Sequence, residues 1–362
     1  MRWSLWCVVL LAGCGVELGP DAGVLVGPAS DSGVALHDSG VTRLDAGTEA
    51  PDAATVLVID AGPVLDAGSL NDAGTSFDAG VCGRCAFGYG SVVNAGIVMN
   101  PALTEISGLA ASRAHPGVLY AHNDSGGRAV IYVMSTTGAD LGELVLDGGT
   151  NADWEDIALG PCPSGTCLYL GEIGDNSLVN PGPYAVYRVA EPSLASPAVS
   201  LGSVSVPFER FALRYPNDEH FNAETLMVHP VTGDLYVVTK PDPFKKASAY
   251  KASAPLSTTS INTLIKLTGL KVPDQLDLQL TAGAIDVCGG AMLIRSYSAM
   301  YQFTVEPTAP FDSIFSNPFT RVPAPVFKVQ ETQGESVTWA AGGGYYTVAE
   351  GVTPTIHFVG CK

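Results

Sequence analysis

The sequence predicts an all-β protein, a β-propeller of four-stranded antiparallel blades, preceded by a disordered tether. Two observations support this prediction. A short apolar run that opens with an acidic residue recurs five times between residues 105 and 340, at intervals of 49 to 69 residues. Each copy is followed by further short runs rich in β-branched and aromatic residues, separated by turns of Pro, Gly and Asp, and such runs are typical of strands. A repeated unit of four strands and about 40 to 50 residues is typical of a propeller blade.

The repeated units are traced by their first runs, which begin at Glu105, Glu155, Glu224, Asp286 and Glu335. Second and third runs follow each of these, and fourth runs occur at 141–146, 204–213, 264–272 and 326–329. The last unit has no fourth run, whereas an unassigned stretch, 90–99, precedes the first unit, so pairing of the two ends would close the ring. Five blades are visible, and the interval from Asp156 to Glu224 has room for a degenerate sixth. A β-sandwich is the alternative, since regular short strands occur in both folds.

Residues 1–13 have the layout of a secretory signal peptide. Arg2 is followed by an apolar run over 3–11 and by Leu-Ala-Gly-Cys at 11–14, which gives a basic start, a short hydrophobic core and a small-residue exit. The apolar run is shorter than the about 20 residues that span a bilayer. The tetrad resembles the bacterial lipobox, which implies lipidation of Cys14 and attachment to the membrane through that lipid. An ordinary secretory signal with an incidental cysteine is the alternative. We therefore expect a lipid-anchored, extracytoplasmic protein of the cell envelope, in the outer membrane or at the cell surface.

Residues 14–80 form an acidic linker in which Asp-Ala-Gly or Asp-Ser-Gly recurs at irregular spacing. Over 15–80 it carries 11 acidic residues against Arg43, a net charge of −10 out of −18 for the whole chain. Because this composition cannot bury enough apolar surface to offset its conformational entropy, we expect the linker to be disordered. A calcium-binding β-roll is the alternative, but its repeats keep a nine-residue period. The acidic charge argues against nucleic acid as a partner.

The propeller domain expected over 81–362 contains six cysteines, an even number that indicates disulfides in an exported protein. Cys162 and Cys167 flank a four-residue turn and are expected to pair. The other four are Cys82, Cys85, Cys288 and Cys361. Ring closure would bring the last of these near one of the first two and leave Cys288 for the other, and the spacing does not decide between these pairings. A metal site at the Cys-x-x-Cys of 82–85 is the alternative, but no second Cys or His pair accompanies it.

The acidic residues that open the five first runs are the main candidates for a functional site. In a propeller the innermost strands surround a central channel, so these carboxylates would converge near one mouth of it. Carboxylates this close repel one another unless a cation neutralises them, and oxygen ligands suit calcium or magnesium. We therefore expect a cation site, with calcium as the cofactor, formed by Glu105, Glu155, Asp156, Glu224, Asp286 and Glu335. The alternative is structural, with each carboxylate accepting hydrogen bonds from backbone amides of the adjacent blade.

Further polar residues lie close to these runs in the sequence. Asp124 belongs to His-Asn-Asp-Ser-Gly and Asp175 to Gly-Glu-Ile-Gly-Asp-Asn, and both are candidates for ligand binding. A polar cluster at 218–222 precedes Glu224. The alternative is that Asp and Asn before Ser or Gly are ordinary turn formers, which bond their own backbone.

Several runs of the domain resemble a group of uncharacterised bacterial secreted β-propeller lipoproteins, distantly similar to β-propeller phytases and phytase-like esterases. These runs are EISGLAAS, HNDSG, DWEDIALG, GEIGDN, AETLMV and QGESV, and the resemblance covers 105–350. In the phytases, calcium ions bound by channel carboxylates hold and polarise the phosphate, and water is the nucleophile. The resemblance implies the same role for the acidic residues at the starts of the runs. It also implies basic ligands for phosphate, for which Lys240, Arg295 and Arg128 are the nearest equivalents, although a basic residue is not present in every unit.

Motifs of other hydrolase and nucleotide-binding classes are absent from the sequence. It has no Gly-x-Ser-x-Gly elbow, no phosphate-binding Gly-Lys-Ser loop and no His-Glu-x-x-His zinc motif. Two hypotheses remain. The first is a binding or scaffolding propeller that is displayed on the acidic tether and recognises a ligand or protein partner. The second is a calcium-dependent hydrolase of phosphoesters or esters, so the sequence leaves open whether the protein is an enzyme. Carboxylate oxygens within about 5 Å of a common point would favour the hydrolase.

Overall fold

The computed structural model describes residues 82–362 apart from 177, 179–183, 195–199, 241–245 and 271–278. The predictions of a signal peptide at 1–13, of lipidation at Cys14 and of a linker at 14–80 lie outside the described residues. Within those residues the secondary structure is almost all β, with two short 3-10 helices, η1 (Pro216–Asp218) and η2 (Phe311–Ser316). No helix in the described part of the chain is long and apolar enough to cross a membrane.

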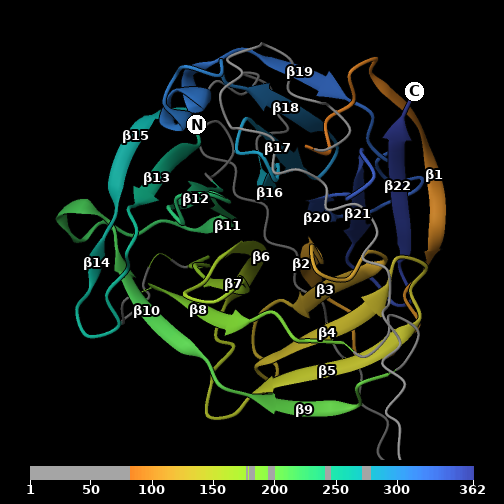
Figure 1. The fold of residues 1–362 in the computed structure, drawn as a ribbon, viewed down its shortest axis with the longest axis horizontal. Coiled ribbons are helices and arrows are strands. Elements are labelled where there is room, and N and C mark those ends of the chain that lie inside the picture. Colours follow the sequence, from red (N-terminus) through yellow and green to blue (C-terminus); the bar gives the residue numbers. More distant parts are fainter. Residues whose placement is uncertain (1–81, 177, 179–183, 195–199, 241–245, 271–278) are drawn as a thin grey trace, which may run out of the picture. The chain divides into compact units, whose positions relative to one another are not determined.

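The strands form five sheets arranged around a centre as the blades of a propeller (Figure 1), which confirms the predicted fold class. Blade 1 contains β2 (Ile106–Ala111), β3 (Val118–Asn123), β4 (Val130–Ser135) and β5 (Asp140–Leu146). Blade 2 contains β6 (Trp154–Pro161), β7 (Thr166–Glu172), β8 (Tyr184–Ala190) and β10 (Glu209–Arg214). Blade 3 contains β11 (Ala223–Val228), β12 (Leu235–Thr239), β13 (Ser248–Ala252) and β15 (Ile265–Gly269). Blade 4 contains β16 (Leu280–Ile285), β17 (Ala291–Ser296), β18 (Met300–Thr304) and β19 (Phe319–Val322).

Blade 5 is built from both ends of the domain. It contains β20 (Gly334–Trp339), β21 (Tyr345–Ala349), β22 (Thr355–Cys361) and β1 (Tyr89–Ile97). The first strand of the domain pairs antiparallel with the last, with Val93 opposite Phe358. The missing fourth run of the last unit is therefore supplied by the predicted stretch at 90–99, and this pairing closes the ring and leaves β1 as the outer strand of blade 5.

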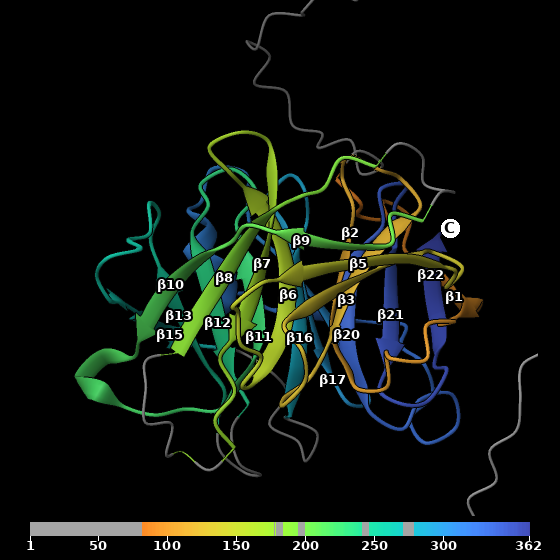
Figure 2. The ribbon, with the colours of Figure 1, turned by 90° about the horizontal axis from the view of Figure 1, so that it is seen from below.

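Two short strands extend the outer edges of blades 1 and 2. β9 (Ser203–Val206) runs parallel to β5 at the edge of blade 1, as both views show (Figures 1 and 2), and β14 (Asn262–Thr263) pairs with β10. The predicted fourth strand at 204–213 thus divides between two blades, and the described residues contain no sixth blade. The predicted fourth strand at 326–329 is wrong. The outer strand of blade 4 is β19, and 326–329 forms a turn closed by a hydrogen bond from Val329 N to Val326 O (3.0 Å).

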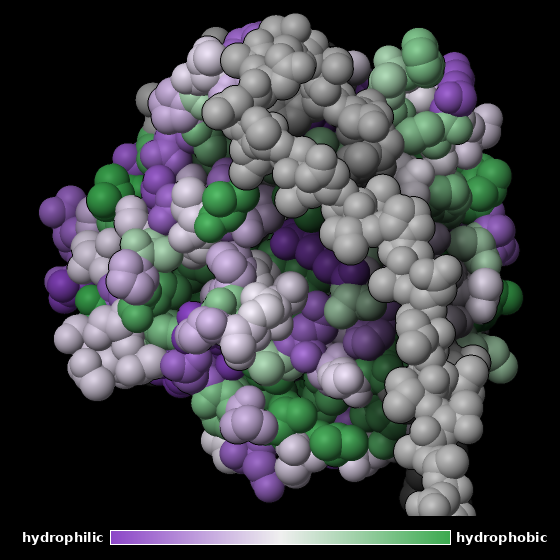
Figure 3. All heavy atoms as spheres, in the orientation of Figure 1, coloured by the Kyte–Doolittle hydropathy of each residue, from purple (hydrophilic) through white to green (hydrophobic). Residues whose placement is uncertain are grey.

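The inner strands β2, β6, β11, β16 and β20 contact one another around the centre of the ring, and the face shown in Figure 3 has hydrophilic residues around a central depression. Close approach of these strands requires small residues. A Cβ added at Gly108 would lie 2.7 Å from the backbone nitrogen of Ile157, and one added at Gly283 would lie 2.7 Å from the side chain of Thr225. Glycine at such positions lets one backbone approach another closely.

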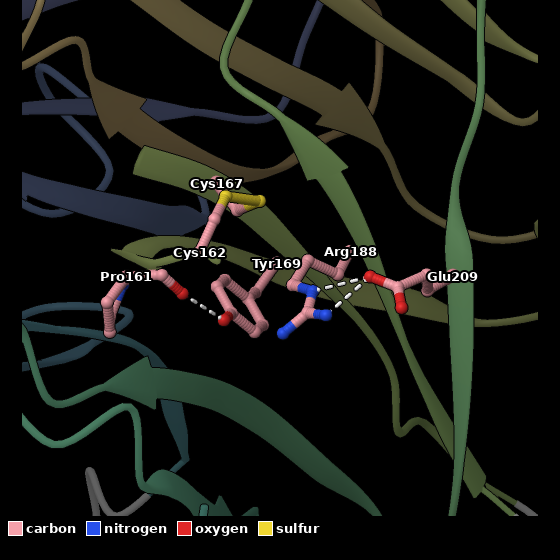
Figure 4. Close-up of a disulfide and its surroundings, with 6 residues drawn as sticks. All are labelled: Pro161, Cys162, Cys167, Tyr169, Arg188 and Glu209. Atoms are coloured by element: carbon pink, nitrogen blue, oxygen red, sulfur yellow. Dashed lines mark hydrogen bonds and ion pairs between the residues drawn. A yellow bond between two sulfur atoms is a disulfide. The ribbon is translucent and has the colours of Figure 1, made fainter. Parts of the chain in front are cut away.

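The six domain cysteines form three disulfides. Cys162–Cys167 closes the turn between β6 and β7, as its spacing predicts, and lies near Arg188, which donates to Glu209 (Nε to Oε2, 2.8 Å; Figure 4). The other two disulfides fasten the segment before β1 to blades 4 and 5, as Cys82–Cys288 and Cys85–Cys361. Structural disulfides are typical of an oxidising environment outside the cytoplasm.

Candidate functional site

Each inner strand carries a β-bulge at its second residue, which has no partner in the neighbouring strand. A bulge bends the strand and redirects the side chain of the extra residue. The bulged residues occupy equivalent positions at the end of the channel where the inner strands begin, which we call the acidic mouth. They are all buried, and they are Ser107, Glu155, Glu224, Thr281 and Glu335.

Three of the predicted cation ligands, Glu155, Glu224 and Glu335, thus stand at equivalent positions in their blades. Blades 1 and 4 have hydroxyl groups there instead. Ser107 Oγ donates to the backbone carbonyl of Glu155 (2.8 Å), and Thr281 Oγ1 donates to the backbone carbonyl of the residue before Glu335 (2.6 Å). These two hydroxyls link adjacent blades, whereas the three glutamates bring their carboxyl groups into the mouth.

The structure corrects the register that the sequence suggests for Glu105 and Asp286. β16 begins at Leu280, and Asp286 follows its last residue at the opposite end of the channel, which we call the far mouth. There Asp286 pairs with Arg84 (Oδ2 to Nε, 2.9 Å). Glu105 precedes β2 and is exposed, and its backbone carbonyl accepts a hydrogen bond from Asp124 N (2.8 Å). The sequence repeats were aligned on their acidic residues. This alignment is wrong for blade 4, because Asp286 follows the end of the inner strand and does not lie near its start.

Asp156 lies inside the ring and acts as a structural clamp. It is fully buried, and Oδ2 accepts hydrogen bonds from Leu226 N (3.0 Å) in blade 3 and from Gly283 N (3.3 Å) in blade 4. Oδ1 accepts from Ile157 N (2.9 Å). Burial raises the pKa of Asp156, and these three amides act in the opposite direction. Because the carboxyl group is occupied by backbone amides of adjacent blades, Asp156 fits the structural alternative and not a metal ligand.

Three carboxylates of blades 1 and 2 gather on one side of the acidic mouth. Asp124 follows β3, Asp153 precedes β6 and Glu155 is the bulged residue of β6, and one oxygen of each lies within 4.8 Å of the others. Asp124 Oδ1 accepts from Ser125 N (2.6 Å). By contrast, no described residue donates a hydrogen bond to the carboxylate of Asp153. Glu155 is 3% exposed, and its carboxylate receives only a long contact from Ser107 Oγ (3.4 Å) among the described residues.

Gly174 leaves the space in which these carboxylates lie. A Cβ at this position would be 2.2 Å from Glu155 Oε1 and 2.4 Å from Asp153 Oδ2. The backbone of Gly174 is held there by a hydrogen bond from its amide to Asp153 O (3.3 Å). The Gly-Glu-Ile-Gly-Asp-Asn run therefore lines the site with the bare backbone of Gly174. Any other residue at this position would place its side chain against the two carboxylates.

Burial and mutual repulsion raise the pKa values of this group. Burial, followed by the charges of Asp124 and Asp175, raises the pKa of Asp153 to about 6. Burial raises the pKa of Glu155 well above its ordinary value, and the charge of Glu224 raises it further. Burial also raises the pKa of Asp124, and hydrogen bonding to Ser125 lowers it. Protonation or a bound cation would relieve this repulsion.

Lys240 balances part of this negative charge. It follows β12 and pairs with Glu224, and its Nζ donates to the hydroxyl of Tyr297 (2.7 Å). Burial raises the pKa of Glu224 to about 7 even though the charge of Lys240 lowers it. Burial and the charge of Glu224 raise the pKa of Glu335 to about 9, again against the effect of Lys240. Buried Oε2 of Glu224 has no hydrogen-bond partner among the described residues.

The donor set fits a hard divalent cation. Several charged side chains shift the pKa values of these carboxyl groups. Lys240 is the one cation among them in the described part of the chain. Its charge lowers the pKa values of five carboxyl groups, those of Asp124, Glu155, Glu224, Glu335 and Glu350. Carboxylate oxygens are the ligands that calcium prefers, and calcium tolerates irregular arrangements of them. A bound cation would replace the protons that otherwise relieve the repulsion.

The remaining predicted ligand residues have other partners. Arg295 is 2% exposed and pairs with Glu331, which also accepts from His357 Nδ1 (3.0 Å). Asp175 accepts from the hydroxyl of Tyr184 (2.8 Å) and lies beside the mouth, where its charge acts on Asp153. Arg128 is largely exposed and pairs with a neighbouring carboxylate, Glu143 (3.0 Å).

Comparison with known proteins identifies no family and finds only distant structural similarity. No protein-family model matches the sequence, and no curated protein matches it. Similar solved structures include a glucose dehydrogenase, with 13% identity over 75% of this chain and 100% of that chain and a TM-score of 0.41. A chain of a nidogen/laminin complex has 13% identity over 68% of this chain and 73% of that chain, with a TM-score of 0.38. Hydrazine synthase of Kuenenia stuttgartiensis has 12% identity over 69% of this chain and 70% of that chain, with a TM-score of 0.36. Similarities this low carry no argument about the site.

Proposed function

We propose that this protein is a membrane-tethered, extracytoplasmic propeller that binds calcium at its acidic mouth and uses the calcium-loaded mouth to bind a ligand or partner. The observation that carries the proposal is the group formed by Asp124, Asp153 and Glu155, whose oxygens lie within 4.8 Å of one another. Two of the three carboxylates have no close hydrogen-bond donor among the described residues, and one of these two is buried. A buried carboxylate without a partner costs several kcal/mol unless a proton or a cation neutralises it.

Attachment to the membrane is proposed through lipid on Cys14. Its support is the sequence Leu-Ala-Gly-Cys after an apolar run at the start of the chain. The three disulfides of the domain agree with folding outside the cytoplasm. The segment before β1 is fastened at the far mouth, where Cys82 lies beside Ala340 and Ala341. The acidic mouth is at the other end of the inner strands from Cys82.

A second candidate function is calcium-dependent hydrolysis of a phosphoester or ester. It is favoured by the same group of carboxylates, because their separation would let one cation contact all three. A bound calcium ion would polarise an oxygen of the substrate. The basic residues give less support, because Arg295 is buried against Glu331 and Lys240 is paired with Glu224. Binding without catalysis is therefore the function that the geometry supports best.

Thermal denaturation of the purified full-length protein tests the cation site. We expect calcium to raise the melting temperature of the wild type relative to EDTA, because a ligand that binds the folded state alone stabilises it. Asp153→Asn should remove most of this increase. Asp312→Asn is the matched control, since Asp312 pairs with Lys251 elsewhere in the domain and its loss should leave the calcium response unchanged. Equal responses in both variants would contradict the site. The hydrolase would be favoured if the wild type turned over phosphoester or ester substrates in the presence of calcium and Asp153→Asn abolished this activity.

A further inference from the structure

A cavity with a volume of about 220 Å³ lies at the far mouth. The final residues of the inner strands line it, and the segment from Cys82 to Gly83 borders it. Ile157 contributes to the lining, whereas the preceding residue, Asp156, clamps blades 2, 3 and 4 together. Along β6, Asp156 therefore stands between Glu155 at the acidic mouth and Ile157 in this cavity.

The lining of the cavity is mainly apolar. Its larger side chains are those of Leu109, Leu159, Val228, Ile285 and Trp339. Trp339 is held in place by a hydrogen bond from Nε1 to Ala284 O (3.0 Å). A closed apolar cavity of about 150 Å³ is large enough to take up benzene, so this one has room for an aromatic ring and a short substituent. Pockets of this kind bind small molecules when a few polar groups fix the orientation.

Arg113 is the charged group that lines the cavity. It lies just after β2 and is half-buried. Among the described residues its side chain makes no ion pair, and its one hydrogen bond is a long contact from Nη2 to Leu159 O (3.5 Å). Burial lowers the pKa of Arg113, while the charges of Glu191 and Asp286 raise it. A guanidinium group that loses water without gaining a close partner is in an unfavourable position unless an anion binds it.

The two nearby carboxylates bind other residues, although buried Oε2 of Glu191 has no hydrogen-bond partner among the described residues. Glu191 Oε1 accepts hydrogen bonds from Ser112 Oγ (2.5 Å) and from the hydroxyl of Tyr120 (3.4 Å). Asp286 pairs with Arg84 and also accepts from Gly290 N (2.7 Å). Neither forms an ion pair with Arg113, although each lies near enough to favour its charged form. The donors of Arg113 therefore remain available to a ligand in the cavity.

We propose that the far mouth binds a small amphipathic carboxylate, with its apolar or aromatic group in the cavity and its carboxylate on Arg113. Hydrogen bonds between a guanidinium and a carboxylate are charge-assisted and can form in pairs, so they fix the ligand at the rim. The apolar walls then select a compact hydrocarbon group over a polar one. This site is distinct from the acidic mouth in position, in charge and in the chemical class of its ligand.

Phenylacetate is a suitable probe, because its ring and short carboxylate arm match this arrangement. It should be titrated into the full-length protein in EDTA, and binding should be followed by calorimetry and by tryptophan fluorescence, since Trp339 lines the cavity. We expect saturable binding with a change in emission. Arg113→Gln should weaken binding about tenfold or more, because a hydrogen bond to a charged group is lost. Arg188→Gln is the matched control, since Arg188 pairs with Glu209 on blade 2 and does not line the cavity, and it should bind like the wild type.

Phenylacetamide provides a test that requires no variant, because it keeps the ring and removes the charge. We expect it to bind the wild type at least tenfold more weakly than phenylacetate, and equal binding would overturn the role of Arg113 as an anion anchor. Ala341→Trp adds bulk at the exposed rim of the cavity and should also weaken phenylacetate binding. Absence of saturable phenylacetate binding to the wild type would overturn the proposal. Because EDTA removes calcium, this result does not depend on the acidic mouth.

Discussion

Glu155 and Glu224 are the bulged second residues of the inner strands of adjacent blades, and the charge of Glu224 raises the pKa of Glu155. The bulge gives both side chains the same placement relative to their strands, so the propeller brings them toward one mouth. Backbone pairing thus holds the carboxyl groups of Glu155 and Glu224 near each other, and Lys240 offsets only part of their repulsion. Such an arrangement destabilises the cation-free protein and is typical of sites that are selected for binding and not for stability.

The first prediction concerns the pH dependence of stability without a cation. The folded-state pKa values of Asp153 (about 6), Glu224 (about 7) and Glu335 (about 9) are all raised above their ordinary values. The folded protein therefore binds more protons than the unfolded chain between about pH 4 and pH 9, and its stability falls as the pH rises through this window. In EDTA we expect the free energy of unfolding to fall by at least about 3 kcal/mol from pH 5 to pH 8. Urea denaturation at these two pH values measures the difference, and a rise in stability would contradict the assignment.

The second prediction concerns the lysine that faces the carboxylates. Lys240→Met keeps the side-chain length but removes the charge that pairs with Glu224. We expect a loss of about 3 kcal/mol at pH 8 in EDTA, because a buried partner is left unpaired. The loss should shrink at pH 5, where the carboxylates bind protons, and also in calcium.

Lys251→Met is the matched control for this substitution. The side chain of Lys251 is 16% exposed, against 11% for Lys240, and it pairs with Asp234 (2.9 Å) and Asp312 (3.1 Å) away from the mouth. It should also destabilise the protein, but neither calcium nor mild acid should restore the loss. Identical behaviour of the two variants would show that Lys240 has no special relation to a cation site.

The third prediction separates the clamp from the metal ligands. Asp156→Asn leaves an amide nitrogen facing backbone donors of blades 3 and 4, so we expect a destabilisation of about 3 kcal/mol. The calcium-induced rise in melting temperature should persist in the variant, since Asp156 is occupied by Leu226 N, Gly283 N and Ile157 N. Loss of the calcium response in a variant that remains folded would instead place Asp156 among the ligands.

The fourth prediction ranks the disulfides by the loops that they close. Cys85 and Cys361 are 276 residues apart, and Cys162 and Cys167 are 5 apart. In the chain-entropy description, a longer loop restricts the unfolded chain more. Replacing both cysteines of the long loop by serine should therefore cost about 5 kcal/mol, against about 2 kcal/mol for the short loop. Guanidinium denaturation of the two double variants measures both values, and a larger loss for the short loop would reverse the ranking.

The fold was largely predictable because it depends on repeated local patterns. Short β-branched and aromatic runs separated by turns identify strands, and their recurrence identifies blades. The missing fourth run of the last unit also predicted the pairing of β1 with β22. The strand predicted at 326–329 failed because its composition resembles that of β19, and only packing against β18 selects Phe319–Val322 as the outer strand.

The acidic mouth was predictable in part. Glu155, Glu224 and Glu335 follow from the repeat, but the bulge that makes them equivalent to Ser107 and Thr281 depends on pairing with a second strand. Asp153 was missed, although it lies two residues before Glu155, the spacing that places side chains on one face of an extended chain. The cavity at the far mouth gave no signal, because five separate strands and the segment at Cys82 combine to form it.

The most direct test of the central claim is a calorimetric titration of calcium into the full-length protein at pH 7.5. The wild type should show one saturable event, and its heat should depend on the buffer, because calcium displaces protons from groups such as Glu224 and Glu335, with pKa values of about 7 and about 9. Asp153→Asn should abolish this event, and Asp312→Asn should retain it. Weak binding by the acidic residues of 15–80 would be common to all three proteins and therefore cancels in the comparison. An unchanged titration of Asp153→Asn, or no saturable event in the wild type, would contradict a cation site at the acidic mouth.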